Sequence, residues 1–174
     1  MKGKVLVAYA THYGATREVA EAVAGRLRER GFEVDVRPAK EADPGDGYGA
    51  VVVGTALYFF RIHRDARKFL SRHRKTLAGL PVAIFATGPV EDKPEQFTDA
   101  RRRLDESLAK SDWLSPVSVA LFGGKLDPQR LRFPHNMPAM KQAPASDLRD
   151  WDAIAAWADE VATKLSAGQA AQPV

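Results

Sequence analysis

Three loops of the sequence carry residues whose types and spacing could do chemistry. The first loop runs from Thr11 to Thr16 (T-H-Y-G-A-T) and joins an apolar run directly to a helical pattern. Gly14 would let the backbone approach a ligand closely, and the N–H groups and dipole at a helix N-terminus attract an anion. Thr11, Thr16 and His12 add donors and the loop has no lysine, so we expect a single phosphate rather than a magnesium-bound triphosphate. The alternative is that Thr11 and Thr16 only cap the helix.

The second loop, Thr55–Arg61 (T-A-L-Y-F-F-R), has three aromatic residues in a row. Because neighbouring side chains of an extended segment point to opposite faces, Tyr58, Phe59 and Phe60 cannot all enter one core face. We expect Tyr58 to stack on a planar ring; alternatively, Phe59 and Phe60 pack under a helix and Tyr58 lies on the surface.

The third loop, Thr87–Val90 (T-G-P-V), is small and turn-forming, and would leave backbone amides free beside a flat ligand.

Alternating strand and helix patterns position these loops. Continuous apolar runs predict buried strands, an alternating run predicts an edge strand, and a 3.6-residue apolar period predicts helices. The predicted strands are Lys4–Tyr9, Phe32–Arg37 (the edge strand), Ala50–Gly54, Pro81–Thr87 and Ser115–Phe122; one helix ends at Arg30 and the others span Arg64–Leu77, Thr98–Lys110 and Trp151–Leu165. The alternation predicts an α/β fold, a doubly wound five-stranded parallel sheet of order 2-1-3-4-5 with helices on both faces. In that order the three loops meet at one edge of the sheet.

The length of 174 residues fits one domain, which we expect over residues 1–165, followed by a flexible C-terminal tail over 166–174. One connection, Gly123–Asp150, is longer than an ordinary strand-to-helix loop and holds four prolines. Loops of that length are usually functional or mobile, and the sequence alone assigns this one no role.

The absence of cysteine excludes disulfides, thiol nucleophiles, Cys-ligated zinc and iron–sulfur clusters. Redox chemistry would therefore need a bound organic cofactor or a metal with nitrogen and oxygen ligands. The four histidines show no metal-ligand spacing; we expect His73 to flank the core, and His63 and His135 to be ordinary polar positions. A phosphoacceptor receiver domain is excluded, because Ala10-Thr11 and Gly54-Thr55 stand where it needs acidic residues.

The motifs T-x-x-G-A-T after the first strand, G-T-A-L-Y-F-F after the third and T-G-P after the fourth resemble flavodoxins. The layout from Met1 to about Leu165 is more closely similar to the flavodoxin-domain family that includes menaquinone-dependent protoporphyrinogen IX dehydrogenase. The runs S-V-A-L-F-G-G-K-L-D-P and D-W-D-A-I-A-A-W-A support this narrower family. The resemblance implies a flavodoxin-like fold and FMN, with the 5′-phosphate on the first loop and the isoalloxazine between the other two. The cofactor-binding residues it implies are Thr11, His12, Tyr13, Gly14, Ala15, Thr16, Thr55, Ala56, Leu57, Tyr58, Phe59, Thr87, Gly88, Pro89 and Val90.

Three features depart from the family pattern. Tyr13 stands where flavodoxins usually carry Thr, L-Y-F-F-R replaces R-Y-G, and Gly123–Asp150 is shorter and less basic than the insert of the porphyrinogen enzymes. We expect an FMN-dependent oxidoreductase that oxidises protoporphyrinogen IX or a related reductant with a quinone acceptor. The alternatives are a flavodoxin-type electron-transfer protein without its own small-molecule substrate, and a flavin-fold scaffold whose site has decayed at Tyr13. None of these requires an acid–base side chain or a metal, so no catalytic residue is named.

The formal net charge of +4 is concentrated in one segment, Arg61–Lys75, which we call the basic segment. It holds seven Lys and Arg side chains against one Asp, a charge of +6, which leaves −2 for the rest of the chain. It is either a solvated helix face or a docking surface for an acidic partner protein or anionic lipid headgroups. We expect a redox partner protein or a quinone as partner and no nucleic acid. We also expect a cytoplasmic protein with peripheral contact to the inner face of the membrane through the basic segment.

Overall fold

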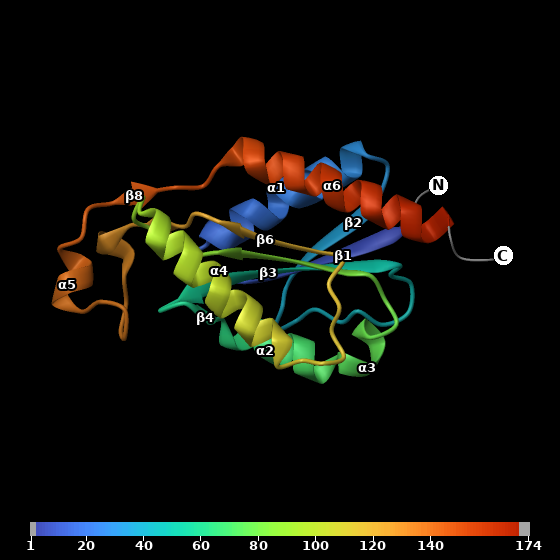
Figure 1. The fold of residues 1–174 in the computed structure, drawn as a ribbon, viewed down its shortest axis with the longest axis horizontal. Helices are drawn as coiled ribbons and strands as arrows, with labels where there is room; N and C mark the ends of the chain where they lie inside the picture. Colours follow the sequence, from blue (N-terminus) through green and yellow to red (C-terminus); the bar gives the residue numbers. More distant parts are fainter. Residues whose placement is uncertain (1–2, 171–174) are drawn as a thin grey trace.

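A parallel sheet runs through the middle of the molecule, between two layers of helices (Figure 1). The computed structural model describes residues 3–170. Its five parallel strands lie in the order β2-β1-β3-β5-β6, which confirms the predicted order 2-1-3-4-5. These strands are β1 (Lys4–Ala10), β2 (Glu33–Pro38), β3 (Ala50–Tyr58), β5 (Val82–Thr87) and β6 (Ser118–Phe122).

The central strands are buried on both faces because they are apolar at almost every position. Every residue of β5 is buried, and in β3 every residue except Tyr58 is buried. In β2 only Val34 is buried, which agrees with the predicted edge position. Neighbouring residues of one strand enter different cores: Val5 packs under one helix layer and Leu6 under the other.

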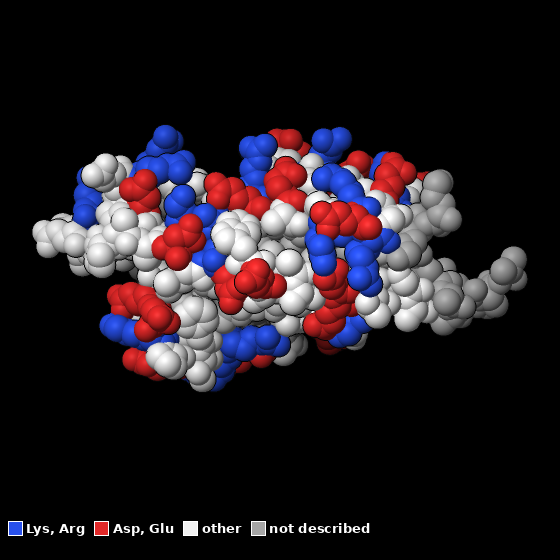
Figure 2. All heavy atoms as spheres, turned by 90° about the horizontal axis from the view of Figure 1, so that it is seen from above, with Lys and Arg blue, Asp and Glu red and all other residues white. Residues whose placement is uncertain are grey.

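The helices divide between the two faces of the sheet. Helices α1 (Ala15–Glu29) and α6 (Trp151–Ala170) cover one face, and α2 (Arg64–Arg72), α3 (Arg74–Leu77) and α4 (Pro94–Ala109) cover the other (Figure 1). On the face formed by α1 and α6, acidic and basic side chains are interspersed (Figure 2). Ion pairs such as Lys164–Glu160, at 2.8 Å, lie on this face. Over residues 3–170, none of the helices combines the length and the apolar character needed to cross a membrane.

The third strand is longer than predicted. The sequence predicts it to end at Gly54, but β3 continues to Tyr58 because its backbone still pairs with both neighbours. Thr55 and Ala56 pair with β5, and Leu57 pairs with Ile62 of the short antiparallel strand β4 (Arg61–Ile62). The second loop is therefore a hairpin at the end of the sheet.

Three helix boundaries also differ from the prediction. The helix predicted over Arg64–Leu77 is interrupted at His73, whose φ of −102° and ψ of 18° separate α2 from α3. Helix α4 begins at Pro94, four residues early, because proline is well accommodated in a first helical turn. The predicted flexible tail is helical as far as Ala170, where the Ser166 hydroxyl donates to the Ala162 carbonyl (2.9 Å). Its remainder, 171–174, lies outside the described residues.

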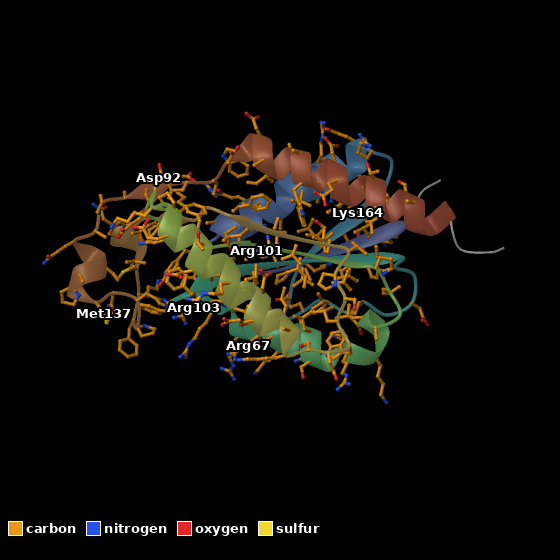
Figure 3. All side chains as sticks on the ribbon, viewed as in Figure 1. Arg67, Asp92, Arg101, Arg103, Met137 and Lys164 are labelled. Carbon is orange, nitrogen blue, oxygen red and sulfur yellow. The ribbon has the colours of Figure 1, made fainter. Side chains whose placement is uncertain are left out.

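The long connection, residues 123–150, is called the cap below. It contains β7 (Lys125–Leu126), η1 (Pro128–Arg130), α5 (Pro138–Lys141) and β8 (Ser146–Asp147), and β7 pairs antiparallel with β8. In Figure 1 the cap extends beyond the ends of β3 and β6, at the left of the molecule. Met137 lies at its outer end (Figure 3). The cap therefore has secondary structure of its own and lies at the edge of the sheet where the three loops meet.

Candidate functional site

The first loop leaves the N-terminus of α1 open. Gly14 is the residue that precedes α1; its φ of 92° is a left-handed conformation that glycine adopts without strain. Its N–H donates to Thr11 Oγ1 (3.0 Å), so Thr11 closes the turn of the loop. Among the described residues no side chain caps α1, and Thr16 instead pairs its hydroxyl with that of Thr87 at 2.8 Å. The two threonines therefore do not cap the helix, and its first N–H groups remain available for an anion.

The hairpin between β3 and β4 turns Tyr58 toward the site. Phe59 and Phe60 have φ values of 49° and 59°, as a two-residue hairpin turn with two left-handed positions requires. Such conformations cost on the order of 1–3 kcal/mol each for residues other than glycine. Phe59 is 60% exposed, whereas Phe60 packs against the core beneath α2 and α4. The alternative for this loop is that Phe59 and Phe60 both pack under a helix and Tyr58 lies on the surface. Of these, the structure shows only the packing of Phe60.

Tyr58 is held by the first loop and by the cap. Its hydroxyl accepts the His12 N–H (3.2 Å), and its ring stacks on that of His135 at 4.8 Å between ring centroids. Burial raises the pKa of Tyr58 to about 12, so the phenol is neutral at physiological pH. A neutral, partly buried ring is suited to stack on a flat ligand.

The third loop does not leave all its amides free, contrary to the prediction. The Gly88 N–H donates to the Phe122 carbonyl (3.1 Å), because the loop pairs with the end of β6. The Pro89 carbonyl accepts the Gly124 N–H (2.8 Å), so the beginning of the cap lies directly on this loop. A side chain at Gly124 would come within 2.8 Å of the Gly88 carbonyl oxygen, which explains why glycine is required there.

A cavity of about 280 Å³, called the first cavity below, lies between the three loops and the cap. Small-molecule sites typically enclose roughly 300–1,000 Å³. Most of the predicted site residues line it: Thr11, Tyr13, Ala15, Thr16, Ala56, Tyr58, Phe59, Thr87, Gly88, Pro89 and Val90. The structure therefore brings the three predicted loops together around one cavity.

Four predicted residues do not line the first cavity. The buried Thr55 hydroxyl is occupied, since it accepts the His63 N–H (3.1 Å) and donates to the Ala56 carbonyl (3.0 Å). Leu57 alternates to the other face of β3 and packs in the core. Gly14 contributes only backbone, and His12 lines a neighbouring cavity instead.

The cap forms a wall that the sequence did not predict. Its lining residues are Gly124, Lys125, Leu126, Asp127, Arg130, Leu131, His135 and Met140. The length and the prolines of Gly123–Asp150 indicated a functional loop, but no spacing signal pointed to these side chains. The prediction that His135 is an ordinary polar position is wrong, because its Nδ1 lies 2.8 Å from the Tyr13 hydroxyl.

Three histidines from three segments gather beside the first cavity. The ring centroid of His12 lies 4.2 Å from that of His63 and 5.2 Å from that of His135. Burial lowers the pKa values of His12 and His63, and the neighbouring imidazoles lower them further. His63 is no ordinary polar residue either: its Nδ1 accepts the Asp65 N–H at the start of α2 (3.0 Å), and its Nε2 is buried without a partner among the described residues. Within residues 3–170, no group of His, Asp or Glu side chains has the arrangement of a metal site.

A second cavity, of about 300 Å³, adjoins the first. It is lined by His12, Tyr13, Gln129, Arg130, Leu131 and Arg132. Tyr13, Arg130 and Leu131 line both cavities, so the two spaces share one wall.

A small number of contacts attach the cap to the body of the molecule. The Tyr13 hydroxyl bonds to His135 and accepts the Arg132 N–H (3.3 Å), and the Ser146 hydroxyl donates to the Val90 carbonyl (2.6 Å). The Arg149 side chain, 4% exposed, pairs with Asp147 (2.7 Å) and with Glu18 of α1. The Arg149 guanidinium lowers the pKa of Asp147.

Comparisons with known proteins agree with this geometry. A family model described as "Flavodoxin domain" matches residues 6–141. The chain is 26% identical over 171 residues to protoporphyrinogen IX dehydrogenase (quinone) of Escherichia coli K12, a match that covers 91% of this chain and 94% of that protein. Among solved structures, a short-chain flavodoxin associated with a bacterial microcompartment has a TM-score of 0.62 at 18% identity, covering 97% of this chain and 99% of that one. Oxidised flavodoxin 1 from Bacillus cereus has a TM-score of 0.58 at 15% identity, covering 94% and 97%. The two structures share the flavodoxin-like fold that the motifs predict.

Proposed function

Because the chain belongs to the flavodoxin domain family, we propose that it is an FMN-dependent oxidoreductase that oxidises protoporphyrinogen IX or a related reductant with a quinone acceptor. The observation that carries this proposal is the first cavity, where an open helix N-terminus, hydroxyl groups and aromatic rings meet at the carboxyl edge of the sheet. The similarity to the E. coli protoporphyrinogen IX dehydrogenase supports the choice of substrates.

The first loop fits the phosphate end of FMN. The uncapped N-terminus of α1 offers N–H groups and the positive end of the helix dipole. Thr11 accepts a hydrogen bond from Gly14, and its hydroxyl lies beside that of Tyr58 at the wall of the cavity, where it can turn to a phosphate oxygen. Thr16 lines the cavity, and its bond to Thr87 fixes the position of its hydroxyl.

The remainder of the first cavity fits the flavin ring. Tyr58, Phe59, Pro89 and Met140 give it an apolar lining, and the cap restricts the access of water. When bound, FMN would supply the redox chemistry, the transfer of electrons from the reductant to the acceptor, for which a cysteine-free chain has no side chain. The residues of this chain would bind the cofactor, orient its ring and shield it.

A flavodoxin-type electron-transfer protein without its own small-molecule substrate is the second candidate. Phe59 favours it, since this residue lines the cavity and is also 60% exposed, so that a partner protein can reach the edge of the site there. The cap favours the oxidoreductase. It covers the other side of the cavity, which blocks a protein partner there but leaves space for a small molecule.

Anaerobic turnover of the FMN-loaded protein with protoporphyrinogen IX and menaquinone distinguishes the two candidates. We expect porphyrin formation at a rate above that of the same concentration of free FMN. A rate equal to that of free FMN would contradict the proposed oxidoreductase activity and would favour the electron-transfer protein. Protein that is colourless as purified and does not quench FMN fluorescence would exclude both, and would favour a scaffold with a decayed site.

We further propose that the basic segment contacts anionic lipid headgroups, which would bring the site to a membrane-soluble quinone. All seven of its Lys and Arg side chains are exposed. None of them lies within 4.0 Å of a carboxylate in the described part of the chain. By contrast, Arg101 and Arg102 of α4 pair with Asp105 and Asp99. Figure 3 shows Arg67 on α2, at the opposite face of the sheet from Lys164 on α6.

Charge reversal tests this contact. The variant R64E/R67E/R72E should lose binding to vesicles that contain phosphatidylglycerol, while its FMN affinity stays unchanged because these side chains line neither cavity. Co-sedimentation at low salt is the measurement. Equal sedimentation of the variant and the wild type would dismiss the contact and leave the segment as a solvated helix face.

A further inference from the structure

The second cavity differs in chemistry from the first, although the two share a wall. Two arginines, a histidine and a glutamine contribute to its lining, and none of its lining residues is acidic. The nearest carboxylate along η1 is that of Asp127, which lines the first cavity and accepts the Gln129 N–H (3.1 Å). The second cavity therefore has the composition of an anion site.

Its arginine side chains are free to bind a ligand. Neither Arg130 nor Arg132 lies within 4.0 Å of a carboxylate among residues 3–170. The neighbouring backbone donors are already used, because the Arg132 N–H donates to the Tyr13 hydroxyl (3.3 Å) and the Arg130 N–H donates to the Asp127 carbonyl (3.1 Å). Two arginines in the lining of one cavity favour a planar anion that guanidinium groups bind in a bidentate manner, such as a carboxylate.

We propose that the second cavity binds a carboxylate of the organic substrate that is oxidised at the first cavity. This inference rests on the proposed function and adds a subsite to it, in which Arg130 and Arg132 receive an acidic side arm of a substrate with an apolar ring system. Arg130 and Leu131 line both cavities, so a substrate that lies beside the flavin can place its side arm in the second cavity. Protoporphyrinogen IX, which carries propionate arms on a tetrapyrrole, belongs to this class.

The phosphate of FMN is the other anion that could occupy the second cavity. The residues at the start of α1, Ala15 and Thr16, line the first cavity and not the second, and so does Thr11. The helix N-terminus that attracts a phosphate thus opens on the first cavity. The arginines of the second cavity remain for a different anion.

Equilibrium titration of the FMN-loaded protein with protoporphyrin IX and with its dimethyl ester tests the inference. Protoporphyrin IX is the stable oxidised form of the tetrapyrrole, and the ester removes only its negative charges. We expect the diacid to bind about tenfold more tightly than the ester or better, because a hydrogen bond to a charged group is worth that much. Added KCl should weaken the binding of the diacid but not that of the ester. Both arginines are exposed, so salt screens their attraction for the carboxylates.

The variant R132Q should bind the diacid no better than the ester, with FMN affinity unchanged. The variant R72Q is the matched control, because Arg72 is an exposed arginine of α2 that lines neither cavity. Equal affinity for diacid and ester, or no binding of either, would overturn the carboxylate site in a protein that still binds FMN. A loss of FMN affinity in R132Q would overturn it too and assign the cavity to the cofactor phosphate. Failure of the wild type to bind FMN would instead overturn the proposed function.

Discussion

The two sides of the first cavity are built in different ways. On the sheet side, the walls are the ends of β1, β3 and β5, strands that are hydrogen-bonded in register and buried on both faces. On the cap side, residues 123–150 are attached by a few contacts, among them the bond from Tyr13 to His135 and the ion pair of Arg149 with Glu18. One side is part of the cooperative core, and the other is an attachment to it.

The difference indicates how a ligand enters. Segments with few buried apolar contacts open at a lower free energy than the core of a protein. Only a few cap residues, such as Leu126, are buried hydrophobics, whereas β3 is buried over almost its whole length. We therefore expect the cap to open and close while the sheet keeps the phosphate loop and Tyr58 in place.

Two matched glycine substitutions should separate the two sides, with the largest effect on the sheet. A Cβ at Gly54 would lie 2.2 Å from the Phe85 ring, and a Cβ at Gly123 would lie 2.2 Å from the Leu148 carbonyl oxygen. Gly54→Ala should lower the free energy of unfolding by about 3 kcal/mol, because the core cannot absorb the added methyl group. Gly123→Ala should lower it by about 1 kcal/mol or less, because both residues of this clash belong to the cap, which lies outside the cooperative core. Urea denaturation measures both, and equal losses would contradict the comparison.

Gly14→Val should damage the phosphate site and leave the fold intact. Valine is strained at a φ of 92°, at a cost of about 1–3 kcal/mol. If the loop relieves this strain by changing shape, FMN affinity should fall by roughly 5- to 150-fold. Quenching of FMN fluorescence measures the affinity. Gly25→Val is the control, since Gly25 lies within α1 and a Cβ there meets no atom within 4 Å beyond the nearby backbone of its own helix. Similar FMN affinity in both variants would contradict the predicted role of the loop.

Arg149→Leu should release the cap. Asp147 and Glu18 lose their shared partner, and we expect proteolytic cleavage within residues 123–150 to become about tenfold faster. Arg26→Leu is the matched control, since Arg26 pairs with Asp159 (2.9 Å) between α1 and α6, away from the cap. If both variants were cleaved in the cap at the wild-type rate, the ion pairs of Arg149 would not hold it.

A low pH should also release the cap of the wild-type protein and make it easier to cleave. Arg149 lowers the pKa of Asp147, so this ion pair stabilises the folded cap above the unfolded pKa of about 4. That contribution is lost as the pH falls through the lowered pKa of the folded protein. Cleavage by pepsin over a pH series should therefore rise at the acid end in the wild type, with a smaller rise in Arg149→Leu. Parallel profiles would contradict this.

Tyr13→Phe should give the smallest effect. The variant keeps the ring but removes the hydroxyl that bonds His135 and Arg132, a net change of about 1 kcal/mol. Hydrogen exchange in the cap should become about fivefold faster. Tyr48→Phe is the control, because it removes the bond to Asp35 (2.6 Å) on the sheet edge. Faster exchange of the cap in both variants would show that the Tyr13 hydroxyl has no special role.

The same contrast explains what could be predicted from the sequence. The sheet order followed from apolar runs such as Val5–Ala8 and Val51–Val53, because a strand buried on both faces has an unmistakable composition. The meeting of the three loops followed from the order of the strands alone. The extension of β3 to Tyr58 did not, because its hairpin turns at Phe59 and Phe60 without the Asn or Gly that signals such a turn.

The cap side could not be predicted because its contacts join residues far apart in the chain. Tyr13 and His135 are 122 positions apart, and the histidine cluster draws on three segments with no common spacing. No periodicity of the sequence encodes such contacts. The departure at Tyr13 acquires a meaning from the structure, since its hydroxyl bonds the cap.

Parallel titrations of the apoprotein with FMN and riboflavin test whether the open N-terminus of α1 binds the cofactor phosphate. The two ligands differ only in this phosphate. We expect the protein to quench the fluorescence of FMN and to bind it about a hundredfold more tightly than riboflavin, since several hydrogen bonds to a charged group depend on the phosphate. Equal affinity for the two ligands, or no quenching of FMN, would contradict a phosphate site at α1.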